Sequence, residues 1–266
     1  MKTIDVHTHY FPDEIGPKTI EHLKGHAAEQ IASYGNGTFK ALCDFMDRDG
    51  VNISVNQPVA TKTSQVVHIN RRMIEHNKSG GNVICFGAMH PDFASVGNVE
   101  EELEFIAKAG IKGIKLHPEY QQFYPDDPKL FKIYEACQKN NLIILFHAGM
   151  DLAFPDTHST PQRMAEVAKI KGLKSIFAHM GGYRMWDEVM KYIAGRDVYL
   201  DTAYCCEMDD ELFKTMMVKH GPEKILFGTD FPWENAANIK TKLENLVEGE
   251  IQEMIYYKNA EKLLGI

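Results

Sequence analysis

The chain has 266 residues, is 44% hydrophobic and 25% charged, and carries a formal net charge of −8. This balance is typical of a globular protein, and the length is ordinary for one α/β barrel, so we expect a single domain over residues 1–266. No basic cluster is longer than Arg71-Arg72, which argues, with the negative charge, against a nucleic-acid partner.

The first residues show no basic segment followed by an apolar stretch, and no apolar run approaches the roughly 18 residues of a membrane span. We therefore expect neither a secretory signal nor a membrane partner. The five cysteines are odd in number and form no C-x-x-C pair. That usage is typical of reduced thiols in a cytoplasmic protein.

Short apolar runs recur along the chain, and an amphipathic stretch follows each of them. The runs are rich in Ile, Val, Leu and Phe without alternating polar residues, as expected for strands buried on both faces of a parallel sheet. The eight expected strands are residues 3–6, 51–55, 83–88, 111–116, 142–146, 175–178, 198–200 and 225–227.

The stretches between these runs are expected to be helices. Residues 99–108 and 128–139 each gather apolar side chains on one face, and 208–220 opens with acidic residues that favour a helix N-terminus. Residues 10–49 exceed what one helix needs, so we expect an elaborated first loop near the active site. Residues 251–264 predict a closing C-terminal helix.

This alternation predicts a (β/α)₈ TIM barrel of the α/β class. The alternative is an open doubly wound sheet. Against it, no G-x-G-x-x-G follows the first strand, and polar residues follow many strands instead of gathering at one crevice.

Imidazole and carboxylate side chains follow the expected strands at their C-terminal ends. They are His7 and His9 after the first strand, His117 after the fourth, His147 after the fifth, His179 after the sixth and Asp230 after the eighth. Side chains two apart on a strand point the same way, and the C-terminal ends of barrel strands converge. The pattern therefore predicts a centre for zinc or a similar divalent ion that can activate water.

The chain resembles the amidohydrolase superfamily, and within it the amidohydrolase-related branch that includes aminocarboxymuconate semialdehyde decarboxylase. The resemblance covers nearly the whole chain. The motifs that carry it are IDVHTH at 4–9, MDRDGV at 46–51, GIKLHP at 113–118, His147, AHMGG at 178–182, GTDFP at 228–232 and NAEKLL at 259–264.

The resemblance implies roles for these residues. His7, His9 and His147 would bind the metal, with Asp230 as a fourth ligand or as the base. His179 would stabilise developing charge or bind a second metal. The expected cofactor is Zn²⁺, as one or two ions, with Mn²⁺ as an alternative.

Further residues are expected to bind substrate. Lys115 matches the strand on which related branches carry a carbamylated lysine; the alternative is a buried ion pair with Asp5 or Glu119. His117 is a site residue or an orienting partner. Arg184 is placed to clamp a substrate carboxylate unless it is a surface residue. Tyr10 and Trp233 are expected in the pocket wall.

The leading expectation is a metal-dependent hydrolase that acts on a small-molecule amide, ester or lactone. The alternative is a metal-dependent, non-oxidative decarboxylase of an unsaturated or aromatic carboxylate, in which His179 and Asp230 handle protons. A third candidate is a metal-binding protein without catalysis, and the carboxylate Asp230 argues against it. The expected partner is a small-molecule substrate, and a homodimer is left open.

Overall fold

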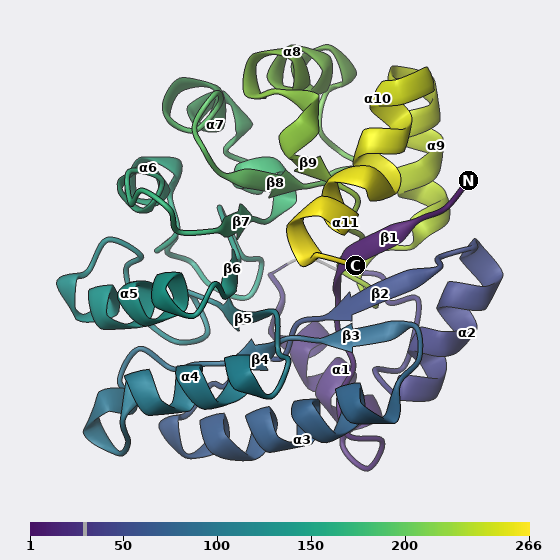
Figure 1. Ribbon diagram of the computed structural model, residues 1–266. Helices are drawn as coiled ribbons and strands as arrows, with labels where there is room; N and C mark the ends of the chain where they lie inside the picture. The colour runs from purple at the N-terminus through teal and green to yellow at the C-terminus, as the bar shows by residue number, and fades with distance from the viewer. Residues whose placement is uncertain (29–30) are drawn as a thin grey trace.

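Parallel strands occupy the centre of the computed structural model, which describes residues 1–28 and 31–266, and helices surround them (Figure 1). Strands β1 to β3 pair in sequence order, and so do strands β4 to β9. The strands are β1 (Ile4–Thr8), β2 (Ile53–Asn56), β3 (Val83–Cys85), β4 (Gly87–Ala88), β5 (Gly113–Leu116), β6 (Ile143–Phe146), β7 (Ser175–Phe177), β8 (Tyr199–Asp201) and β9 (Ile225–Leu226).

Two junctions turn these strands into a ring. The third expected strand is divided at Phe86 into β3 and β4, and the Phe86 N–H donates to the carbonyl of Asn56 on β2. The Val6 N–H donates to the carbonyl of Phe227 at 2.9 Å, which joins β1 to the end of β9. The expected (β/α)₈ TIM barrel is confirmed, with one strand in two pieces.

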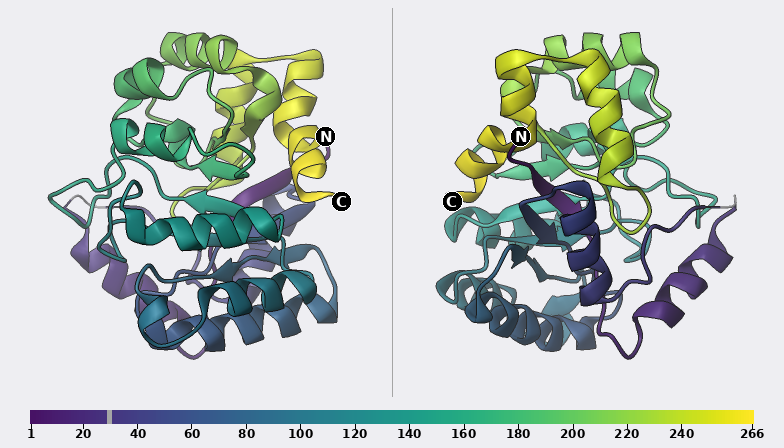
Figure 2. Two further views of the ribbon diagram at one scale, coloured as in Figure 1. Left: turned by 60° about the vertical axis from the view of Figure 1, so that its left-hand side comes forward. Right: turned by 90° about the vertical axis from the view of Figure 1, so that its right-hand side faces the viewer.

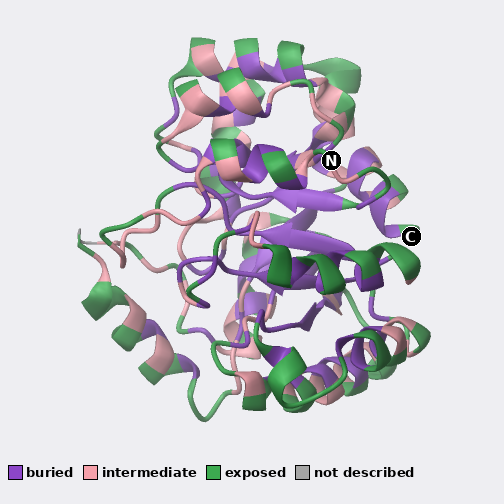
Figure 3. Ribbon diagram, turned by 90° about the vertical axis from the view of Figure 1, so that its left-hand side faces the viewer, coloured by how far each residue is buried: buried purple, intermediate pink, exposed green. Residues whose placement is uncertain are grey.

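The α-helices lie mainly outside the strands and turn their apolar faces inward (Figure 3). They are α1 (Gly16–His26), α2 (Phe39–Asp49), α3 (Val66–Ser79), α4 (Val99–Lys108), α5 (Phe131–Lys139), α6 (Pro161–Val167), α7 (Trp186–Tyr192), α8 (Asp210–His220), α9 (Ala236–Leu246), α10 (Gly249–Glu253) and α11 (Asn259–Leu264).

Short turns of other helical type lie between them. They are η1 (Thr63–Gln65), η2 (Phe93–Ser95), η3 (Pro128–Leu130), η4 (His179–Gly181), η5 (Pro222–Lys224) and the π-helical η6 (Met254–Lys258).

Local sequence signals begin and end these helices where physical chemistry expects. The side chains of Asn98 and Asp209 accept backbone N–H bonds at the starts of α4 and α8. Gly50 ends α2 in the left-handed conformation, with φ of 64°. The helix expected at 128–139 begins as η3 before it continues as α5.

The C-terminal segment closes one end of the barrel. The expected helix at 251–264 is α10, η6 and α11 in succession, with a π-helical turn at its centre. Leu263 and Leu264 of α11 belong to an apolar cluster with Ile4 and Val6 of β1 and Leu226 of β9. We call this cluster the closing-helix cluster.

The expected first loop lies at the other end, away from the chain termini (Figure 2). Residues 10–38 contain α1, and α2 then packs on the barrel. The Tyr34 N–H donates to the carbonyl of Pro232, and the Ala28 N–H donates to the carbonyl of Leu152. The loop therefore contacts the chain that follows β9 and β6. None of the helices in the described ranges is long and apolar enough to cross a membrane.

Candidate metal centre

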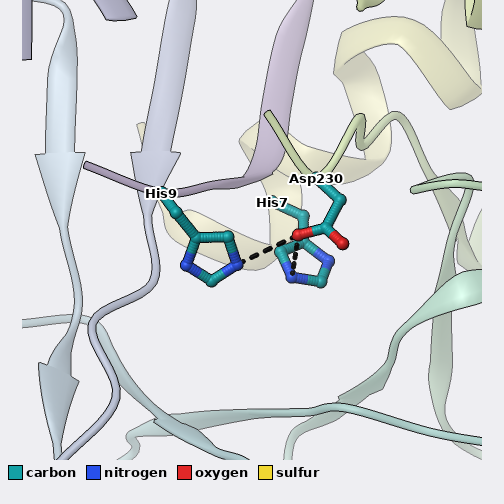
Figure 4. A group of neighbouring side chains, drawn as sticks. All are labelled: His7, His9 and Asp230. Carbon is teal, nitrogen blue, oxygen red and sulfur yellow. Dashed lines mark ion pairs between the residues drawn. The ribbon is translucent and has the colours of Figure 1, made fainter. Parts of the chain in front are cut away.

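Three side chains from the two ends of the chain meet at the C-terminal ends of the strands (Figure 4). His7 is on β1, His9 follows it, and Asp230 follows β9. Asp230 Oδ1 lies 3.0 Å from His9 Nε2 and 3.4 Å from His7 Nε2. One carboxylate oxygen thus faces two imidazole nitrogens, a donor set that suits zinc and manganese.

A buried carboxylate orients His7. Asp201, at the end of β8, accepts a hydrogen bond from His7 Nδ1 at 3.0 Å, which fixes the tautomer in which His7 Nε2 is the nitrogen that an ion can bind. The other Asp201 oxygen accepts from the backbone N–H groups of His179 and Ala203. Gly228 permits this close packing, because an added Cβ would lie 3.2 Å from His7 Cβ and 3.3 Å from Asp201 Cβ.

Two carbonyl oxygens orient His147 and His179 in the same way. His179 Nδ1 donates to the Ala203 carbonyl at 2.9 Å, and His147 Nε2 donates to the Met150 carbonyl at 3.2 Å. We assign these tautomers from the hydrogen-bond partners. The remaining nitrogens, His179 Nε2 and His147 Nδ1, then lie 3.1 Å apart with lone pairs facing each other. A cation bound between them would relieve the repulsion that these tautomers imply.

The charge state of these groups fits a cation. Burial, first of all, holds the pKa of His7 and His147 well below the usual range, so both imidazoles are neutral. Burial alone would raise the pKa of Asp230, but the hydrogen bond from His9 and the other polar groups around the carboxylate outweigh burial and hold that pKa below its usual range. Neutral imidazoles and an ionised carboxylate are the forms that bind a divalent ion.

The backbone at two of these residues is strained. His179 has a φ of 60° and Asp230 a φ of 67°, in the left-handed region that side chains other than glycine rarely adopt. Such outliers persist where surrounding structure holds them, and they gather at functional sites.

Lys115 lies against the same group. Its ammonium Nζ donates to His7 Nε2 at 3.1 Å, and the residue is 1% exposed. Burial lowers the pKa of Lys115 to about 8. The structure therefore places Lys115 beside His7, whereas the sequence left open a pair with Asp5 or Glu119.

His117 belongs to a second group with His147 and Asp151, whose ligand atoms also lie close together. The His117 and His147 rings, however, stack in parallel, with centroids 4.3 Å apart and an interplanar angle of 7°. An imidazole binds a metal in its ring plane, so two parallel rings do not direct lone pairs at one ion. This arrangement fits hydrogen bonding better than a shared cation.

The remaining predicted pocket residues lie in different surroundings. The Tyr10 hydroxyl contacts His76 Nδ1 at 3.0 Å and Cys85 Sγ at 3.4 Å, among the residues of α3 and β3. Trp233 is partly buried one turn beyond Asp230. Arg184 is exposed, and its Nε donates to Glu207 Oε1 at 2.7 Å.

Three acidic residues of the site were not singled out from the sequence as site residues. They are Asp201 after β8, Glu119 after β5 and Asp151 after β6. Asp201 carried a usable signal, since it ends an apolar run as Asp230 does. Asp151 lies four residues beyond His147, where sequence alone does not fix the direction of a loop.

Comparisons with known proteins agree with this fold. The family model described as Amidohydrolase matches residues 4–266 of the chain. No curated protein matches the chain.

Solved structures of similar fold cover the whole chain. An uncharacterized TIM-barrel protein from Bordetella bronchiseptica is 17% identical, with a TM-score of 0.79 over 100% of this chain and 99% of that one. The 5-carboxyvanillate decarboxylase of Sphingomonas paucimobilis is 17% identical, with a TM-score of 0.71 over 100% and 99%. A dihydroxybenzoic acid decarboxylase from Polaromonas, solved with manganese and the inhibitor 2-nitroresorcinol, is 18% identical, with a TM-score of 0.70 over 99% and 97%.

Proposed function

We propose that this chain, which belongs to the amidohydrolase family and is an enzyme of that family, is a divalent-metal-dependent, non-oxidative decarboxylase of an unsaturated or aromatic carboxylate. The observation that carries the proposal is the buried Lys115 ammonium, 3.1 Å from His7 Nε2. An ion bound at His7 Nε2 would take the lone pair that otherwise accepts from Lys115. The ion and the released ammonium would then be two cationic groups for one substrate carboxylate. Decarboxylases among the structures of similar fold, one of them with manganese, support this reading.

His7, His9, His147 and Asp230 would hold the ion, and His179 is a further donor beside them. A bound divalent ion would supply positive charge that attracts and orients the substrate carboxylate. Manganese and zinc are both candidates, because imidazole and carboxylate ligands bind either. Asp201 would keep His7 in the tautomer in which Nε2 can bind the ion.

Decarboxylation breaks the bond between the carboxylate and the neighbouring carbon, and the electron pair stays on that carbon. One proton must then reach the carbon as carbon dioxide leaves. The ionised Asp230, at the partly open mouth where its side chain is 15% exposed, would orient the solvent molecule that delivers this proton to the carbon. His179 would stabilise the negative charge on the substrate while the proton is transferred.

Hydrolysis of an amide, ester or lactone, the leading expectation from the sequence, would use the same ligands and the same carboxylate base. The comparisons support decarboxylation better, because a 5-carboxyvanillate decarboxylase and a dihydroxybenzoic acid decarboxylase are among the structures of similar fold.

The test is an assay by reaction class. The manganese-loaded and zinc-loaded protein is supplied with hydroxylated and unsaturated aromatic acids, and separately with amides, esters and lactones. We expect release of carbon dioxide from at least one acid, and loss of that release after chelation. Carboxylate formation from the second set without carbon dioxide from the first would replace the proposal by hydrolysis.

A further inference from the structure

One wall beside the candidate metal centre combines aromatic rings with an acid. We call it the Asp151 wall, and its residues are His117, Tyr120, Asp151 and Phe154. Tyr120 stands edge-on to both neighbours, with ring centroids 4.7 Å from His117 and 4.9 Å from Phe154. Asp151 Oδ2 lies 3.5 Å from His117 Nε2. Aromatic rings next to a polar group are typical of surfaces that bind a small ligand.

The wall faces the metal centre. The His117 ring of the wall stacks on the His147 ring at a centroid distance of 4.3 Å, and His147 Nδ1 lies 3.1 Å from His179 Nε2. The side chain of Asp151 is 14% exposed. A substrate whose carboxylate lies at Lys115 and the ion therefore extends toward Asp151.

Asp151 keeps an oxygen available for a ligand. Its Oδ1 accepts the Ala153 N–H at 2.8 Å, which fixes the carboxylate on its loop. Within residues 1–28 and 31–266, the partner of its Oδ2 is His117 Nε2 at 3.5 Å, too long for a good hydrogen bond.

A second acidic side chain, Glu119, stands behind His117, and burial raises its pKa to about 7. Glu119 is fully buried, and its Oε1 accepts from the His158 N–H, the Ser159 N–H and the Ser159 hydroxyl. Its Oε2 has no hydrogen-bond partner, and lies 3.7 Å from His117 Nδ1, which also has none. Unsatisfied groups this deep are rare unless a site uses them.

We propose that Asp151 determines substrate specificity by accepting a hydrogen bond from a ring hydroxyl and repelling a second carboxylate. The inference rests on the proposed decarboxylase function and narrows its substrate class. The preferred substrate is a hydroxylated aromatic monocarboxylate, and the matching dicarboxylate is rejected. A hydroxyl gains a charge-assisted hydrogen bond at Oδ2, whereas a carboxylate there meets a like charge.

The test compares ligands that differ only in the group that reaches Asp151. Binding of 2-hydroxybenzoate and phthalate, and of 3-hydroxybenzoate and isophthalate, is measured by calorimetry on the manganese-loaded protein. The variant is Asp151→Asn, which keeps the acceptor for the Ala153 N–H but loses the charge. The matched control is Asp156→Asn, an exposed aspartate of the same loop.

We expect the natural chain to bind the hydroxy acid of at least one pair about tenfold more tightly than the dicarboxylate. Asp151→Asn should bring that ratio close to one, and Asp156→Asn should leave it unchanged. An unaltered ratio in Asp151→Asn, or an equal change in the control, would overturn the inference. If the ratios behave as expected but no hydroxybenzoate yields carbon dioxide, the proposed function fails and the specificity assignment stands.

Discussion

The two ends of this barrel bury different kinds of side chain. At the C-terminal ends of the strands, His7, His147, Lys115 and Asp201 are nearly inaccessible yet polar. At the other end, the closing-helix cluster buries aliphatic side chains of β1, β9 and α11. Burying polar groups costs free energy unless partners satisfy them, whereas burying aliphatic groups is favourable. Burial at the closing-helix end therefore stabilises the fold. This stabilisation offsets the free-energy cost of burying polar groups at the metal-site end.

The backbone shows the same contrast. His179 and Asp230 hold positive φ values at the metal-site end. At the other end, positive φ occurs at Gly221, Gly265 and Asn141, residue types that adopt it more readily than others. Backbone strain at non-glycine residues such as His179 is thus found where chemistry is expected. If the two ends are independent, a substitution at one end should leave the property of the other end unchanged.

The largest effect should follow removal of the metal. A chelator should abolish turnover, and added manganese or zinc should restore it. Because the ion binds only the folded chain, it should also raise the free energy of unfolding, by about 2.7 kcal/mol at a free concentration 100 times its Kd. Turnover is assayed on protein whose metal content is checked by elemental analysis. Unfolding with and without the metal measures the change in stability. Full activity in metal-free protein would refute a metal-dependent reaction.

Leu263→Ala should destabilise the closing-helix end. Leu263 is 7% exposed in the closing-helix cluster, so truncation should lower the free energy of unfolding by about 2–5 kcal/mol. Turnover per folded molecule should stay unchanged, since the cluster lies away from the metal ligands. Ile266→Ala, at a residue 49% exposed, is the control and should change stability little. A matching fall in kcat for Leu263→Ala would show that the ends are coupled.

Asp230→Asn should lower turnover without lowering stability, the opposite of Leu263→Ala. Asparagine tolerates a φ of 67° as aspartate does, so the fold should persist. The base and its charge are lost, so we expect turnover to fall by at least about 10²-fold with stability equal or higher. Steady-state kinetics with chemical unfolding measures both. Near-normal turnover would remove Asp230 from the mechanism and leave the proton work to His179.

Asp201→Asn should weaken metal binding although it changes none of the proposed metal ligands. The amide can still accept from the backbone at one oxygen, but its NH₂ group would face His7 Nδ1 and favour the wrong tautomer. We expect about tenfold or weaker metal affinity. Asp197→Asn, at an exposed residue two positions before the same strand, is the control. Unchanged affinity in metal titrations would reduce Asp201 to a structural role.

The sequence predicts much of this molecule because strand burial and strand ends leave local signals. The alternation of apolar runs with amphipathic stretches predicted the barrel. The residues that follow those runs include His7, His147 and Asp230. The break at Phe86 left no signal, since residues 83–88 are apolar throughout. Tyr10 follows His9 directly, yet its ring turns toward His76 because tertiary packing decides the direction of a loop side chain. Asp151 was missed for the same reason.

The smallest effect concerns a histidine at the end away from the metal. His220 ends α8, and both of its ring nitrogens have partners: Nε2 donates to the Val198 carbonyl at 3.0 Å, and Nδ1 accepts the Gly195 N–H at 3.2 Å. Burial lowers the pKa of His220, and nearby Lys224 lowers it further, against Glu223. Protonation would also break the bond from Gly195.

Because the folded pKa lies below the unfolded value of about 6.5, the unfolded chain binds the proton more readily. The contribution of His220 to stability is therefore complete above pH 6.5 and is lost as the pH falls below it toward the folded pKa. Relative to His220→Gln, the natural chain should lose stability over this range with a slope of at most about 1.4 kcal/mol per pH unit. His68→Gln, at an exposed histidine, should show no such difference. Urea unfolding of the three proteins between pH 5 and 7.5 provides the comparison. Parallel curves for all three would mean that His220 does not titrate there, and that acid sensitivity arises at the metal-site end.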